Sequence, residues 1–193
     1  NQITKLTHNQ MDILIHPTYF PSISHFVALT QSERITFETA DNFQKQTNRN
    51  RTYIYSPNGI QLLNIPVKHS KSLEAAYRSS PFFEYFEDDI RPIFEKKHTF
   101  LLDLNFETFD FILKSMRLKL EYETTTEYFQ EVDTTIITDF RELANGKKDT
   151  SEFESYTQVF DDKHGFINNL SVLDVLFNEG KFALDYLKNQ KIQ

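Results

Sequence analysis

The sequence predicts an α/β fold in a single domain, with a mixed, partly parallel sheet and helices on both faces. Segments with the two-residue alternation of strands are interspersed with segments whose apolar residues recur at the 3.6-residue period of helices. The length of 193 residues suits one domain, and 19 Phe with 9 Tyr supply the apolar area for a large core. Only 4 Gly and 6 Pro argue against long flexible linkers.

Most of the predicted strands lie in the N-terminal half. Short apolar or alternating runs occupy residues 11–15, 34–38, 53–55 and 60–67. Asn58 and Gly59 separate the last two runs, and this dipeptide predicts a β-hairpin because both residues tolerate a positive φ. Weaker strand patterns follow at 118–122 and 156–160.

Helical periodicity dominates the rest of the chain. Apolar residues recur at helical spacing in residues 22–30, 73–77, 82–94, 106–116, 136–143, 171–179 and 182–187. The expected N-caps are Ser22, Ser80, Asn105 and Ser171. We expect Pro92 to kink or restart its helix, and Gly180 to take the left-handed position that ends the last long helix.

The pattern changes abruptly at three places. Residues 1–10 are polar and aperiodic, so we interpret them as an upstream extension or a remnant of cloning ahead of a domain that covers 11–193. Near 68–72 the strand pattern passes into a helix pattern with hardly a turn, and 145–151 is similarly abrupt. We therefore expect flexible residues to be missing from the sequence at these two places.

Charge and residue types argue against several classes of function. A formal net charge of −7 argues against nucleic-acid binding, which needs clustered Lys and Arg. The lack of Cys excludes disulfides and thiolate chemistry and suits a reducing cytoplasm. No apolar run reaches the roughly 20 residues of a membrane span. The six His are scattered and no P-loop or G-x-G-x-x-G motif is present, so we expect no metal and no cofactor.

The strongest functional signal is a concentration of positive charge and amides in the segment that ends at Arg51. If a strand begins near Arg49, both arginines share one face, and their guanidiniums match the geometry of a phosphate or carboxylate. Asn48 and Lys45 are candidates for further contacts to the same small anionic ligand. The alternatives are solvated side chains or internal ion pairs with some of the 28 acidic residues.

A second candidate site lies directly after the first predicted strand. His16 and Tyr19 stand in a stiff two-proline loop, at what should be the carboxyl end of that strand, where open α/β sheets bind ligands. The reference pKa of His, near 6.5, suits His16 for general-base catalysis. The alternative is a His that is hydrogen-bonded within a structural loop. We expect His25 to be a partly exposed helix residue.

The last long helix carries two further polar candidates. Asp174 and Asn178 lie one turn apart on the same helix face, where they could hold a ligand or another loop. Asp174 also follows Ser171 at the spacing of a capping box. The simpler interpretation of Asp174 is therefore a helix cap.

Three segments together resemble the WbqC-like family of bacterial proteins. Residues 16–26 are similar to the family's opening Q-P-x-Y-x-P loop, with His16 in place of Gln. Residues 42–51 are similar to its q-f-x-K…x-N-R motif, and residues 169–180 to its C-terminal L-S-I-x-D-x-L-F-N motif. The resemblance spans most of 11–187 and rests on the order and spacing of the motifs.

The resemblance implies a transferase that moves an acyl or aminoacyl group, and glycine is one candidate for that group. Its substrate would be an amino sugar or nucleotide sugar used to make surface polysaccharide, the O-antigen of lipopolysaccharide. Arg49 and Arg51 would hold an anionic group, with His16 and Tyr19 near the reacting amine. The alternative is a non-catalytic module of the same pathway that binds a sugar nucleotide or a partner protein. The sequence leaves open whether the protein is an enzyme and whether it forms a homo-oligomer.

Overall fold

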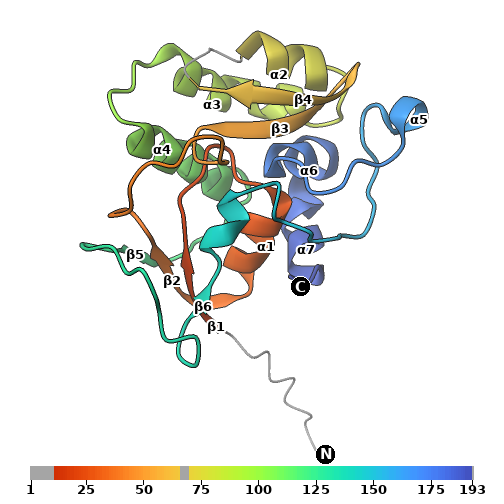
Figure 1. Cartoon of the computed structure of the whole chain (residues 1–193). Helices are drawn as coiled ribbons and strands as arrows, with labels where there is room; N and C mark the ends of the chain where they lie inside the picture. The colour runs from red at the N-terminus through yellow and green to blue at the C-terminus, as the bar shows by residue number, and fades with distance from the viewer. Residues whose placement is uncertain (1–10, 66–69, 193) are drawn as a thin grey trace, which may run out of the picture.

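The computed structural model describes residues 11–65 and 70–192, and its main sheet consists of four parallel strands (Figure 1). In spatial order the strands are β5 (Tyr122–Thr124), β2 (Ser32–Phe37), β1 (Met11–Ile15) and β6 (Thr138–Asp139). The predicted α/β class in one domain, with parallel strand pairing, is confirmed. Because all four strands run the same way, their carboxyl ends lie along one edge of the sheet.

The β1–β2 pair forms as the sequence predicts. The apolar run of β1 lies next to β2, with Ile13 opposite Ile35 and both side chains buried. Helix α1 (Ile23–Thr30) connects the two strands, and its N-cap Ser22 accepts a hydrogen bond from the backbone N–H of His25 at 3.4 Å. This connection leaves the residues that follow β1 at the carboxyl edge of the sheet.

The predicted hairpin is confirmed and forms a separate sheet. Strands β3 (Arg51–Ser56) and β4 (Gly59–Asn64) pair in antiparallel fashion, and Gly59 has the positive φ, 92°, that the tight turn requires. Helix α2 (Ser70–Tyr77) packs against β3, beside the hairpin in Figure 1. The antiparallel pairing is therefore in a second sheet rather than at the edge of the main one.

The remaining helices surround one continuous apolar core. They are α3 (Phe83–Glu95), α4 (Leu101–Ser115), α5 (Asp161–His164), α6 (Val172–Glu179) and α7 (Ala183–Asn189), with 3₁₀ turns η1 (Arg141–Ala144) and η2 (Gly180–Phe182). Phe37 of β2 contacts Phe109 of α4 edge-on, with 5.3 Å between ring centroids. Phe177 of α6 contacts Phe83 of α3 at 5.2 Å in the same manner. These aromatic contacts fix the helices against each other and against the sheet.

Two of the predicted helix starts are wrong. Helix α4 begins before Asn105, whose side chain donates a hydrogen bond to the carbonyl of Pro17 at 3.2 Å instead of capping the helix. Helix α3 begins after Ser80, whose hydroxyl donates to the carbonyl of Tyr77 at 2.7 Å. Pro92 lies inside α3 without restarting it. In both wrong starts another hydrogen-bond partner competes for the polar side chain.

Three weaker predictions are corrected by tertiary pairing. The segment 136–143 is not one helix, because Thr138 pairs with Ile13 and forms β6 ahead of η1. The strand expected at 118–122 begins only at Tyr122, as β5. In the described chain, 156–160 contains no strand. Strand formation depends on a neighbouring strand more than on local propensity, which explains all three differences.

Two predictions about chain continuity stay predictions. Residues 1–10 and 66–69 lie outside the described residues, so the structure does not bear on the proposed extension or on the start of the suspected gap near 68–72. The segment 145–151 starts with a turn in which the carbonyl of Asn145 accepts the N–H of Lys148 at 2.8 Å. Of the helices in the described ranges, none has the length and apolar character needed to cross a membrane.

Candidate functional site

A polar pocket of about 310 Å³ lies at the carboxyl edge of the main sheet, and we call it the central pocket. Its lining includes His16, Asp41, Arg49, Asp139, Arg141 and Lys148. The chain leaves β1 toward β2 on one side, whereas β6 lies on the other side of β1. In open α/β sheets the crevice at such a change of direction is the usual ligand site.

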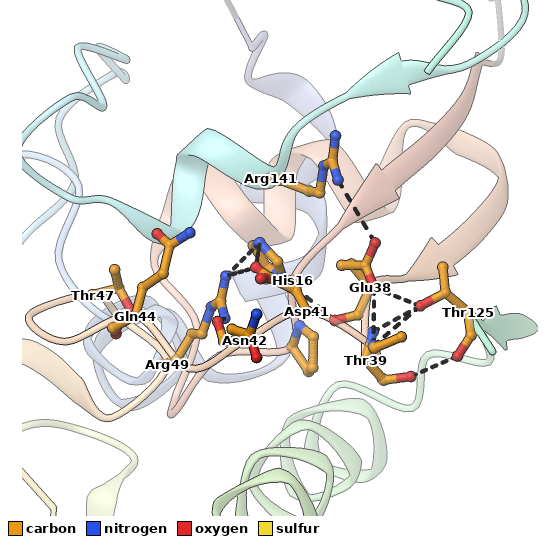
Figure 2. A network of polar contacts seen from close by, with 12 residues as sticks. His16, Glu38, Thr39, Asp41, Asn42, Gln44, Thr47, Arg49, Thr125 and Arg141 are labelled. Carbon is orange, nitrogen blue, oxygen red and sulfur yellow. Dashed lines mark hydrogen bonds and ion pairs between the residues drawn. The ribbon is translucent and has the colours of Figure 1, made fainter. Parts of the chain in front are cut away.

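His16, Arg49 and Asp41 form a buried cluster at one wall of this pocket (Figure 2). Nη2 of Arg49 lies 2.7 Å from Nε2 of His16 and donates to Oδ2 of Asp41 at 2.6 Å, while Nη1 donates to the carbonyl of Asn42 at 3.0 Å. The Arg49 and Asp41 side chains are only 10% and 9% exposed. Arg49 therefore forms the internal ion pair that the sequence left open as an alternative to ligand binding, and it still borders the pocket.

His16 is held in its neutral form. Burial, and then the positive charge of Arg49, lower the pKa of His16 to about 4. Nδ1 faces the carbonyl of Glu38 at 3.4 Å, so it carries the proton and Nε2 is left to accept the hydrogen bond from Arg49. The lone pair that a general base needs is therefore engaged by Arg49.

Arg141 provides the second guanidinium of the central pocket. Its Nε and Nη2 donate to the carboxylate of Asp139 at 2.9 and 2.6 Å. Burial raises the pKa of Asp139, but the hydrogen bonds from Arg141 outweigh burial and hold that pKa below its usual value. The Arg141 guanidinium also lies 5.7 Å from the centroid of the Tyr128 ring, which forms another part of the wall.

Glu38 links the two arginine clusters from the end of β2. Its side chain is fully buried, and Oε1 accepts hydrogen bonds from the hydroxyl of Thr125 at 2.7 Å and the N–H of Ala40 at 2.9 Å. Oε2 lies 3.6 Å from Nη1 of Arg141, as Figure 2 shows, and has no hydrogen-bond partner among the described residues. The carboxyl group of Glu38 therefore lies beside Arg141, and its backbone carbonyl lies beside His16.

The fixed charges of the central pocket are balanced. Three basic residues, Arg49, Arg141 and Lys148, line it together with three acidic ones, Asp41, Asp139 and Glu142. Lys148 pairs with Glu142 at 2.8 Å, so each basic residue has an acidic neighbour. A ligand that carries both signs of charge suits such a lining better than a purely anionic one.

The other residues predicted for the anion site are not brought together with Arg49. Strand β3 begins at Arg51, so the two arginines do not alternate on one strand face, and Arg51 donates to the carbonyl of Gln46 instead. Lys45 is exposed and does not line the central pocket. Asn48 is buried and lines a different pocket.

Tyr19 lies in the apolar core. Its side chain is 1% exposed, its ring contacts Phe20 at 4.7 Å between centroids, and burial raises the pKa of its hydroxyl. It is not part of the lining of the central pocket. The catalytic role predicted for Tyr19 therefore has no support from its position.

Asp174 and Asn178 belong to a separate buried network. Asp174 accepts hydrogen bonds from the hydroxyls of Tyr77 and Tyr156 at 2.8 and 2.6 Å, and from Nε2 of Gln158 at 2.9 Å. Asn178 donates to the backbone carbonyl of Asp174 at 2.8 Å. Burial raises the pKa of Asp174, against the effect of its three donors. The side chain of Asp174 is thus neither a helix cap nor a wall of the central pocket.

His25 is buried rather than partly exposed. His25 is a residue of α1 and is only 1% exposed, and burial lowers its pKa to about 3. Neither ring nitrogen finds a hydrogen-bond partner of good geometry in the described part of the chain. The imidazole is therefore neutral, and the poor hydrogen bonding of its buried ring reduces the stability of the fold.

Four of the charged residues that the sequence did not reveal share a position in the fold, namely Glu38, Asp41, Asp139 and Arg141. Each one ends a parallel strand or follows it closely. The sequence held a signal for two of them, because Asp139 and Arg141 alternate shortly after an apolar pair, Ile136 and Ile137, at the spacing of a strand end. Interpreting 136–143 as a helix concealed that signal.

The fold and the central pocket define a class of protein: an α/β domain whose parallel sheet carries a charged polar pocket at its carboxyl edge. The sequence profile of the WbqC-like protein family matches residues 16–72 and 67–148, which together cover more than half of the chain. The chain belongs to the WbqC-like protein family. Comparisons with curated proteins and with solved structures gave no match. The match includes every residue of the central pocket, whereas the C-terminal motif at 169–180 lies beyond it.

Acidification should destabilise the fold through its two buried imidazoles. The folded-state pKa values of His16 and His25, about 4 and about 3, lie below the ordinary value of 6.5, so between pH 6.5 and 4 the unfolded chain binds more protons than the folded one. Stability from these two groups is therefore present above pH 6.5 and lost as the pH falls. We expect a loss of about 3–4 kcal/mol from them between pH 7 and pH 5.

Urea unfolding at pH 7, 6 and 5 measures this loss. The variant His25→Leu should be more stable than the wild type at pH 7. Between pH 7 and pH 5 it should lose only about half of the unfolding free energy that the two imidazoles together cause the wild type to lose. The control His164→Gln alters an exposed imidazole and leaves both buried ones in place. If His25→Leu and His164→Gln give the same pH dependence as the wild type, the assignment to buried neutral histidines is wrong.

Proposed function

We propose that this protein is an acyl or aminoacyl transferase that modifies the amine of an amino sugar in the cytoplasm. The product would enter bacterial surface polysaccharide, such as the O-antigen of lipopolysaccharide, and glycine is one candidate for the transferred group. Membership of the WbqC-like family supports the pathway, because the resemblance implies it. The central pocket would hold the amino sugar.

The observation that carries this proposal is the pairing of opposite fixed charges in one pocket. An amino sugar phosphate, or an amino sugar joined to a nucleotide, carries a phosphate and an amine on the same molecule. Arg49 and Arg141 would bind the phosphate, while Asp41 and Asp139 would face the amine. The volume of about 310 Å³ lies near the lower end of small-molecule sites, so a nucleotide would extend beyond the pocket.

Acyl transfer to an amine forms a C–N bond, expels the leaving group of an activated donor and releases a proton from the amine. Asp41 and His16 lie 3.5 Å apart at the wall and are the candidates to accept that proton. A phosphate that draws the guanidinium of Arg49 toward itself would free Nε2 of His16. It would also weaken the charge effect that lowers the pKa of His16. Ligand binding and activation of the base are thus coupled through Arg49.

A second candidate function is a non-catalytic module that binds the same sugar for a partner enzyme. The observation in its favour is the state of His16, which is neutral, weakly basic and hydrogen-bonded to Arg49 without ligand. In that case the central pocket would bind the sugar phosphate and no transfer would follow. The two functions share a site and differ only in turnover.

Calorimetry with glucosamine phosphates and uridine diphosphate amino sugars tests the site. We expect Arg49→Lys to weaken binding at least tenfold, because lysine keeps the charge but loses the planar fork. The matched control Arg51→Lys makes the same change outside the central pocket and should alter affinity less than about twofold. Equal losses in the two variants, or no binding to the wild type, would refute the proposed site.

Turnover separates the two candidate functions. The wild type is incubated with the bound amino sugar and activated donors, namely acyl and glycyl thioesters, and the sugar is analysed by mass spectrometry. A mass increase equal to the transferred group supports the transferase. Tight binding with no mass increase for any donor supports the non-catalytic module.

A further inference from the structure

A second polar pocket, of about 380 Å³, lies behind one wall of the central pocket. Its lining includes Asn48, Tyr53, Asp149, Asn168, Asn169 and Ser171. Asn48 lies between Thr47 and Arg49, which line the central pocket, and Asp149 follows Lys148, which also lines it. The two pockets therefore share two chain segments as a common wall but have no lining residue in common.

Hydrogen bonds hold the loops of this second pocket in one arrangement. Oδ2 of Asp149 accepts from the hydroxyl of Ser24 at 2.5 Å and from Nδ2 of Asn169 at 2.7 Å. Oδ1 of Asn169 accepts the N–H of Ser24 at 2.9 Å, and Nδ2 of Asn168 donates to the carbonyl of Ser151 at 2.7 Å. Asn169 adopts a left-handed φ of 52°, which is uncommon for a residue other than Gly. The pocket is thus pre-organised around its amide side chains.

One polar atom of this wall is left without a partner. Asn48 is 7% exposed, and its Oδ1 accepts no hydrogen bond from any residue within 11–65 or 70–192. The backbone of Asn48 is fixed, because its N–H donates to the carbonyl of Ala144 at 2.7 Å and its carbonyl accepts the N–H of Tyr19 at 2.9 Å. A buried amide oxygen on a rigid backbone, bordering a cavity, calls for a donor such as a ligand hydroxyl.

The charges of the lining decide which ligand fits. Among the described residues that line the second pocket none is Lys or Arg, whereas Asp149 and Glu152 are acidic. A phosphate or carboxylate would be repelled there. Amides, carboxylates and hydroxyls match the alternating donors and acceptors of sugar hydroxyls, and the ring of Tyr53 offers an apolar face for the C–H groups of a sugar.

We propose that the second pocket binds an uncharged sugar unit, with Oδ1 of Asn48 accepting a hydrogen bond from one of its hydroxyls. This site is separate from the central pocket and does not depend on the activity proposed for it. The protein then holds a neutral sugar on one side of the shared wall and a charged sugar on the other.

The test measures NMR chemical shifts of side-chain amides on addition of the methyl glycosides of glucose, galactose, mannose and N-acetylglucosamine. We expect the amide signal of Asn48 to move with at least one glycoside. The blocking variant is Gly146→Leu, because a Cβ at the exposed Gly146 would lie 3.3 Å from Nδ2 of Asn48 and the side chain would cover that amide. It should weaken binding at least tenfold.

The neighbouring substitution Lys147→Leu is the matched control, since Lys147 is exposed and does not line this pocket. It should leave the glycoside affinity unchanged. Glucosamine phosphate binding to Gly146→Leu reports on the central pocket separately and should be retained. Three results would overturn the proposal: no shift with any glycoside, equal affinity in Gly146→Leu and the wild type, or loss of glycoside binding in Arg49→Lys instead.

Discussion

Replacing Arg49 by alanine should lower the free energy of unfolding by about 3–5 kcal/mol, the range for removing one partner of a buried ion pair. The change leaves the carboxylate of Asp41, only 9% exposed, without its guanidinium, and it removes the donor to Nε2 of His16. The positive charge that helps to lower the pKa of His16 disappears as well, while the charge of Asp41 stays. The pKa of His16 should therefore rise above its value of about 4.

Urea unfolding of Arg49→Ala, Asp41→Asn and the double variant measures the ion pair directly. The double variant should be less destabilised than the sum of the single changes, because it leaves no unpaired buried charge. A titration of His16 by NMR in Arg49→Ala measures the expected rise in pKa. Additive losses in the cycle, together with an unchanged titration of His16, would contradict the cluster of three side chains.

Replacing Asp174 by alanine should cost about 3–5 kcal/mol, because two buried hydroxyls lose their acceptor and the amide of Gln158 loses one of its acceptors. Tyr77, Tyr156 and Gln158 all donate to this one carboxylate, at 2.6 to 2.9 Å. Asp174 is 0% exposed, so water cannot replace the lost acceptor without opening the core. The network joins α2, the segment before α5, and α6, and its loss should loosen all three.

The matched control for this change is Asp185→Ala, which removes an exposed carboxylate from α7 and should change stability by less than about 0.5 kcal/mol. The variant Asp174→Asn keeps one acceptor oxygen and should fall between the two. Thermal and urea unfolding of the three variants provide the comparison. Equal stability of Asp174→Ala and Asp185→Ala would mean that the buried network does not stabilise the fold.

The two predictions concern different parts of the molecule, the central pocket and the buried scaffold. Arg49 and Asp41 belong to the central pocket, so their loss should affect both stability and binding of a charged sugar. Asp174 lies outside that pocket, so Asp174→Ala should reduce stability while the folded fraction still binds the ligand. The measured affinity of folded protein in each variant therefore separates residues of the site from residues of the scaffold.

Local patterns predicted the elements that depend on neighbours in sequence. Helix α1 forms behind its Ser22 cap, the hairpin turns at Gly59, and α6 lies between its N-cap Ser171 and its C-cap Gly180. At Gly180 φ is positive, and an added Cβ would lie 2.6 Å from the ring of Phe82. Each of these signals acts within one turn of chain, through a cap, a positive φ or an apolar period.

The site was predicted only in part, for a physical reason. His16 was recognised because it directly follows a clear strand, and Arg49 because its charge stands out in an acidic chain. The partners of both residues, Asp41 and Glu38, lie after a different strand. Asp139 and Arg141 lie about 100 residues after Asp41 in the chain and reach the pocket only because β6 pairs with β1.

By itself, the sequence determined the fold class, the family, most helices, the hairpin, and two side chains of the central pocket, His16 and Arg49. Each of these follows from local periodicity, caps, turns or motif spacing. The tertiary structure alone decided that Arg49 pairs with Asp41, that Arg51 points elsewhere, and that Asp174 holds two tyrosines in the core. A side chain's partner depends on which segments the folded sheet brings together, and burial then decides whether its charge is paired within the protein or left for a ligand.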